Sequence, residues 1–184
     1  MSMIIGEAKK GWNIIDLYNS GARLSPTYRR FKPSGSAMLK NLIPYVGTSS
    51  LLIQVLHRGV SLPMMYQVDI MFSDVEFSNE EQMPLGPWMK LVYQDRQVWV
   101  KKLDVRKNRV KVRCSCPNEY FAWAWQGFQQ GYLFGSQPKR YIRKTLDRPR
   151  VNPNNYAGIC KHIAASVVLA QNMGWIAPSS IPWR

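Results

Sequence analysis

The sequence has few acidic residues, only three cysteines and no long apolar run. Its 184 residues include 11 aspartates and glutamates against 25 lysines and arginines. The uncharged stretch at residues 41–57 contains Pro44 and Gly47 and is too short to cross a bilayer. Residues 1–10 show no basic leader followed by an apolar run, so we expect neither an export signal nor a membrane protein. An odd cysteine count without export also argues against a disulfide framework.

Positive charge therefore dominates the composition. The net charge of +14 predicts a polyanionic partner, either nucleic acid or an acidic protein surface. The excess is uneven: residues 1–63 carry 8 basic and 2 acidic side chains, residues 64–116 carry 9 and 7, and residues 117–184 carry 8 and 2. A solvated basic surface is the simpler alternative, because net charge also governs solubility.

The chain is long enough for one domain, and 46% hydrophobic and 12% aromatic residues can supply a packed core. Residues 1–63 show little periodicity and are punctuated by glycine, serine and proline. Within them we expect only a short helix near residues 11–18 and a strand near residues 51–56. A segment of this length with so few elements predicts an extended, irregular N-terminal arm that packs on another molecule.

Residues 64–184 show clearer elements and are expected to form the domain. Residues 64–77 alternate between apolar and polar side chains, which indicates a strand. Further strands are expected at 91–93, 98–103 and 109–114, and helices at 119–130 and 161–173. The turn Lys107-Asn108 is expected to close the last two strands into a hairpin. The predicted fold class is α+β, with a small antiparallel sheet and a C-terminal helix around a structural zinc site, plus the N-terminal arm.

The zinc prediction comes from Cys114, Cys116, Cys160 and His162, which form a C-x-C…C-x-H pattern that uses every cysteine. On an extended segment, side chains two residues apart point to the same side, so Cys114 and Cys116 can converge on one ion. Cys160 and His162 stand where the last helix begins, and the helix dipole there favours thiolate. Three thiolates and one imidazole are the four tetrahedral ligands of a closed structural zinc site.

Two alternatives involve no metal. The three cysteines can be reduced and buried beside a structural histidine. Cys160 and His162 can also be considered as a nucleophile and its base. However, side chains two residues apart do not naturally meet at a strand end or helix start, and no third orienting group stands out.

At this point the sequence resembles a known family. C-x-C…C-x-H is similar to the ligand signature of SWIM-type zinc fingers, although the 43-residue spacer is longer than in typical SWIM domains. The words VRCSCP (112–117), YFAWAW (120–125) and NPNNYAGICKH (152–162) resemble a SWIM-like module in structural proteins of tailed bacteriophages. The resemblance covers about residues 109–170. It implies a zinc-containing virion protein, made in the host cytoplasm and present in multiple copies in a symmetric assembly.

A second candidate site precedes the first cysteine pair. Arg109, Lys111 and Arg113 alternate with Val110, Val112 and Cys114, so one face of the strand is expected to carry three cations. A solvated face is the simpler interpretation. The alternative is a stripe that faces phosphates or carboxylates.

The stretch between the ligand pairs, residues 117–159, contains nine aromatic side chains. We expect Trp123 and Trp125 to lie in the core beside the metal, and His57, alone among apolar residues, to be structural. Aromatic and arginine side chains are enriched in interfaces and also stack on single-stranded bases. The candidates for such contacts are Tyr132, Phe134, Arg140, Tyr141 and Arg143.

These observations leave two functional hypotheses. No glycine-rich phosphate loop, Ser/His/Asp arrangement or carboxylate pair stands out, and four protein ligands leave zinc no open position, so we expect no enzymatic activity. The first hypothesis is a virion assembly subunit whose basic arms and aromatic-rich loop hold neighbouring virion proteins with acidic surfaces. The alternative is a zinc-dependent nucleic-acid-binding protein that uses the basic strand and the aromatic and arginine loop.

Overall fold

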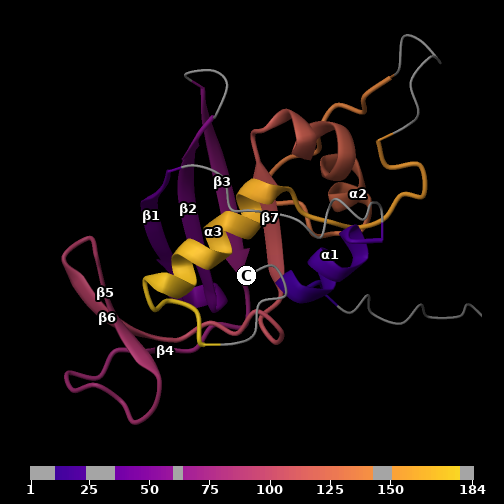
Figure 1. Cartoon of the computed structure of the whole chain (residues 1–184). Helices are drawn as coiled ribbons and strands as arrows, with labels where there is room; N and C mark the ends of the chain where they lie inside the picture. The colour runs from indigo at the N-terminus through magenta and orange to yellow at the C-terminus, as the bar shows by residue number, and fades with distance from the viewer. Residues whose placement is uncertain (1–10, 24–35, 60–63, 143–150, 179–184) are drawn as a thin grey trace, which may run out of the picture.

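The computed structural model describes residues 11–23, 36–59, 64–142 and 151–178. Two antiparallel sheets and three α-helices make up this part of the chain, which confirms the α+β class (Figure 1). None of its helices has the length and apolarity that a membrane crossing requires.

The larger sheet has the strand order β1-β2-β3-β7. Its strands are β1 (Ala37–Tyr45), β2 (Ser50–Arg58), β3 (Met65–Phe72) and β7 (Val110–Cys114), and the short turn η2 (Val46–Thr48) joins the first two. Register places Val55 opposite Val68, and Val68 opposite Cys114. The next row is formed by Ile53, Ile70 and Val112. Because these side chains are buried, this face of the sheet forms the core.

The smaller sheet has the order β4-β6-β5 and consists of β4 (Phe77–Ser78), β5 (Trp88–Tyr93) and β6 (Arg96–Lys101). Gln94 and Asp95 join β5 to β6 with φ of 50° and 60°, which is the backbone of a two-residue hairpin turn. Strand β7 belongs to the larger sheet and does not pair with β6, so the hairpin predicted at Lys107-Asn108 is wrong. Asn108 instead donates from Nδ2 to the carbonyls of Ser73 and Asp74, where the chain passes from one sheet to the other.

The strand expected near residues 51–56 is confirmed as β2, but the prediction that the rest of residues 1–63 forms an irregular arm is wrong for residues 37–49, which contain β1 and η2. The pattern of β1 was hidden by Pro44 and by a register shift between Leu39 and Asn41. Both features are tolerated because β1 is an edge strand, where a proline removes no ladder hydrogen bond. The remainder of the predicted arm, residues 1–10, 24–35 and 60–63, lies outside the described residues.

Helix α1 (Ile14–Gly21) also belongs to the core and confirms the first predicted helix, shifted by three residues. Asn13 caps it, since its Oδ1 accepts a hydrogen bond from the backbone N–H of Asp16 at 2.8 Å. Ile14 and Leu17 are fully buried. Figure 1 shows α1 beside β7.

Two predicted helical segments are confirmed in the C-terminal half. Residues 119–129 form a π-helical turn, η3 (Glu119–Trp123), followed by α2 (Ala124–Gln129). Helix α3 (Lys161–Asn172) crosses the core face of the larger sheet (Figure 1). It buries Ile163, Val167 and Ala170, and the chain leaves it through Gly174 at φ +83°.

Candidate metal centre

The structure places Cys114, Cys116, Cys160 and His162 in one cluster. Their candidate ligand atoms all lie within 4.8 Å of one another, and all four residues are buried. Cys114 is the last residue of β7, whereas Cys160 immediately precedes α3 and His162 lies in its first turn. The cluster therefore joins the end of one strand to the start of the helix that covers it.

The extended backbone at the end of β7 determines where the side chains of Cys114 and Cys116 point. Cys114 follows Val110 and Val112 on the buried face of β7, towards α3. The pairing with β3 continues past the strand, because Ser115 N–H donates to the Gln67 carbonyl and Gln67 N–H donates to Ser115 Oγ, both at 2.9 Å. The chain thus remains extended through Ser115. Cys116 consequently points to the same side as Cys114, as the spacing predicted.

Backbone N–H groups already point at the sulfur atoms. The N–H of Cys116 donates to Cys114 Sγ, and the N–H of Glu119 donates to Cys116 Sγ, each at 3.4 Å. At the other pair, Cys160 has an extended backbone and makes no side-chain cap, so its sulfur is available to the cluster. The two backbone N–H donors stabilise negative charge on the sulfur atoms of Cys114 and Cys116 and fix the orientation of these ligands.

A second histidine, His57, holds the first turn of α3. The Ser166 hydroxyl donates to the His162 carbonyl at 2.9 Å, so it must accept from the Nε2–H of His57, 2.8 Å away. Burial lowers the pKa of His57 to about 4, which keeps the ring neutral. The prediction that His57 is structural fits this position.

The ring of His162 is enclosed by other rings. Its centroid lies 5.2 Å from that of His57 and 5.0 Å from that of Tyr66. Its Nδ1 lies 3.8 Å from Cys114 Sγ and is the nitrogen that faces the cluster.

Without a cation, the three thiols share negative charge unequally. The Cys114 thiol donates to Cys116, which lowers the pKa of Cys116 far below its usual value and raises that of Cys114. Burial raises the pKa of Cys160. Burial also raises the pKa of Glu119 to about 8. A divalent ion would allow all three sulfur atoms to be thiolates.

The donor set fits a metal ion. A tetrahedral ion with metal–sulfur bonds of about 2.3 Å separates its sulfur ligands by about 3.8 Å, and the candidate ligand atoms here all lie within 4.8 Å of one another. Thiolate and imidazole ligands suit zinc and other soft or borderline metals, whereas magnesium and calcium require oxygen ligands. The four residues can therefore hold a metal ion, and their chemistry is compatible with zinc.

Tight packing supports the cluster from the side of Cys160. Trp123 is almost fully buried, as predicted, and its ring covers Gly158, where a Cβ would lie 2.5 Å from the ring. Gly158 N–H also donates to the hydroxyl of Tyr132 at 3.1 Å. The prediction of Tyr132 as an interface residue is wrong, because its ring is buried.

The predicted stripe of three cations is only partly present. Arg109 precedes β7 and forms an ion pair with Asp74, with Nη2 and Oδ1 2.6 Å apart. Arg113 is half-buried and donates to the Ser136 carbonyl at 2.9 Å, while Lys111 is exposed. Two of the three side chains thus make internal contacts.

The other contact candidates lie around α2. Arg140 lies 5.5 Å from the centroid of Trp125, which is half-exposed rather than in the core. Tyr141 is exposed and packs edge-on against Phe121, with ring centroids 4.8 Å apart. Phe134 is half-buried. Arg143 lies outside the described residues.

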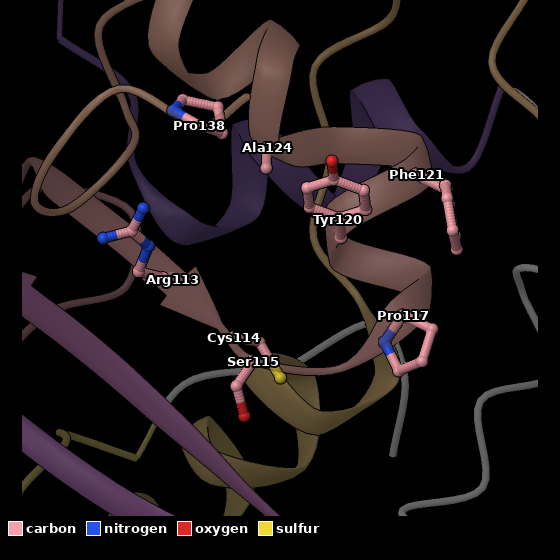
Figure 2. Close-up of a pocket in the computed structure, with 8 residues that line it drawn as sticks. All are labelled: Arg113, Cys114, Ser115, Pro117, Tyr120, Phe121, Ala124 and Pro138. Carbon is pink, nitrogen blue, oxygen red and sulfur yellow. The ribbon is translucent and has the colours of Figure 1, made fainter. Parts of the chain in front are cut away.

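A pocket of about 400 Å³ opens next to the cluster. Figure 2 shows Arg113 and Cys114 from β7 on one side of it and Tyr120 on η3 on the other. Further lining residues are Pro117, Phe121, Ala124 and Pro138. The sequence prediction missed this pocket, although the aromatic run 120–125 was a signal for it.

The fold and this cluster define an α+β protein with a candidate Cys3His metal centre. No family model matches the chain, and neither curated proteins nor solved structures show a significant similarity to it.

Proposed function

We propose that the chain is a non-enzymatic, zinc-stabilised structural subunit, with zinc bound by Cys114, Cys116, Cys160 and His162. The observation that carries this proposal is the burial of four protein donors within 4.8 Å of one another. Four protein ligands complete a tetrahedral shell, so such a zinc has no position for a substrate or a reactive water. Its contribution is to stability.

The position of the cluster supports a structural role. Zinc would connect β7 to α3 across a spacer of 43 residues. Closing so long a loop costs little more than closing a short one, because loop entropy grows only logarithmically with length. Binding the ion therefore contributes directly to the folding free energy of the C-terminal half.

The resemblance to phage structural proteins extends the proposal to a place in the virion of a tailed bacteriophage. There the subunit would hold neighbouring virion proteins with acidic surfaces through its basic and aromatic side chains. The net charge of +14 and the exposed aromatic rings near α2 support this extension. Mass spectrometry of purified particles tests it: the chain should be present at a fixed stoichiometry, and its absence would contradict the virion assignment.

The two histidines of the chain offer a matched test of the metal site. We expect purified wild-type protein to contain one zinc per chain by plasma mass spectrometry, and His162→Gln to lose most of it. His57→Gln removes a buried histidine that contacts the same helix turn but supplies no ligand. It should lower stability and retain stoichiometric zinc. Equal zinc loss in both variants, or a wild-type protein without zinc, would overturn the assignment.

A further inference from the structure

The pocket beside the metal cluster has an apolar interior. Pro117, Phe121, Ala124 and Pro138 line it, and Tyr120 and Phe121 are 41% and 46% exposed. Large aromatic side chains left open around a concave surface are typical of binding sites.

The only charged side chain in the pocket lining is Arg113, and the chain segment around the lining residues is mostly basic. Between residues 111 and 142 the basic side chains are Lys111, Arg113, Lys139 and Arg140, and the only acid is Glu119. Glu119 is fully buried. Arg113 lines the pocket and is held in place by its hydrogen bond to the Ser136 carbonyl (Figure 2). A ligand in the pocket therefore meets a fixed cation and no exposed carboxylate of this segment.

We propose that this pocket binds an acidic segment of another protein by accepting one apolar or aromatic side chain between Tyr120 and Pro138. Carboxylates next to that side chain would pair with Arg113 and with the exposed Lys139 and Arg140. This proposal deepens the proposed structural function and rests on it, because the candidate metal ligand Cys114 lines the pocket. It names the surface and the kind of neighbour the subunit holds.

The lining favours a protein segment over a nucleic acid. A base presents polar edges that need hydrogen-bond partners, and leaving them unpaired in an apolar site costs free energy. The lining offers few polar side chains to such edges, because Pro117, Phe121, Ala124 and Pro138 are apolar. An apolar side chain needs no such partners, and its burial is favourable.

The test is titration of the zinc-loaded, ¹⁵N-labelled full chain with a blocked peptide in which one phenylalanine is flanked by two glutamates on each side. We expect saturable shifts at residues 113–124 and 138–140. A peptide with serine in place of phenylalanine should bind at least tenfold more weakly. Absence of binding at millimolar peptide, or shifts confined to other residues, would overturn the proposal.

Two phenylalanines provide matched variants, since Phe121 lines the pocket whereas Phe128 is similarly exposed outside it. Phe121→Ala should weaken peptide binding about tenfold, and Phe128→Ala should leave it unchanged. An equal loss in both would overturn the proposal. Single-stranded (dT)20 forms the competing arm: binding of (dT)20 that Phe121→Ala abolishes, without peptide binding, would assign the pocket to nucleic acid instead.

The same samples separate the two proposals. One zinc per chain without peptide binding contradicts the pocket proposal alone. A wild-type chain without zinc contradicts the proposed function, whatever the peptide does.

Discussion

The two sheets of this protein are stabilised in different ways. The larger sheet is covered by α3, and its rows of buried side chains end at the cysteine cluster. The smaller sheet buries few residues, among them Leu91, Val98 and Val100, and leaves Val92 62% exposed. Its longest pairing is the local hairpin of β5 and β6. The larger sheet thus depends on the remote contacts with α3 and the cysteine cluster, whereas the longest pairing of the smaller sheet is local.

This difference predicts how far the destabilising effect of a substitution extends through the structure. A hairpin forms from residues next to each other in sequence, so a change there is expected to act locally. The cluster joins Cys114 to His162, 48 residues further along the chain, so the loss of one ligand removes a connection that nothing local replaces.

The largest effect is therefore expected from Cys116→Ser. The variant should lose zinc and at least about 4 kcal/mol of stability, because loss of a structural metal belongs to the small class of severe changes. Guanidinium titration followed by tryptophan fluorescence measures it, since Trp123 lies buried near the cluster. A chelator should reproduce the change in the wild type. Loss of metal without loss of structure would contradict the structural role.

Gly158→Ala tests the packing that supports the cluster. The new Cβ would lie 2.5 Å from the ring of Trp123, which is buried and cannot move away cheaply. We expect a loss of about 2 kcal/mol, within the usual cost of overpacking. Gly47→Ala is the matched control, because a Cβ there meets nothing within 4 Å. Equal unfolding midpoints for the two variants would show that the contact with Trp123 is unimportant.

The four candidate ligands could be identified from sequence because each pair is local. Strand periodicity aims Cys114 and Cys116, and the start of α3 positions Cys160 and His162. Only the fold shows that the two pairs of ligands lie next to each other. For His57 the sequence indicated only a structural role, and Glu119 carried no signal, since the contacts of both depend on which helix turns and rings surround them after folding.

The prediction failed where partner choice depends on distant residues. Neither Lys107-Asn108 nor Gln94-Asp95 contains the glycine that usually marks a two-residue hairpin. Sequence alone therefore did not decide which turn closes a hairpin. Strand β1 was missed for a related reason: an edge strand tolerates Pro44 because its second partner is absent.

Asp95→Gly tests the local character of the smaller sheet. Asp95 adopts φ +60°, a conformation that glycine adopts without steric cost. We expect hydrogen-exchange protection at Leu91 and Val98 to rise by about 0.5 kcal/mol, with protection in α3 unchanged. Asp95→Val should lower protection at the same two amides, because a β-branched side chain is strained at positive φ. Equal changes in α3 would show that the sheets are coupled.

The smallest effect is expected at the surface between the two sheets, where Arg109 pairs with Asp74. The side chains are 58% and 48% exposed, so solvent screens the pair despite its two short hydrogen bonds. We expect Arg109→Met, which keeps the aliphatic stem, to cost about 0.5 kcal/mol in a urea titration at neutral pH. The matched control is Lys107→Met, since Lys107 lies 3.9 Å from Asp104 and is 84% exposed, so its loss should be undetectable.

The pH dependence of the Arg109 effect has a definite sign. The hydrogen bond from Arg109 lowers the pKa of Asp74 in the folded protein. A carboxyl whose pKa is lowered by folding contributes stability above its unfolded pKa, and this contribution is lost as the pH falls through the folded pKa. The difference between wild type and Arg109→Met should therefore be fully present at neutral pH and shrink on acidification. A difference that stays unchanged at low pH would mean that Arg109 stabilises the protein through contacts other than Asp74, and the junction of the two sheets would then depend on packing rather than on charge.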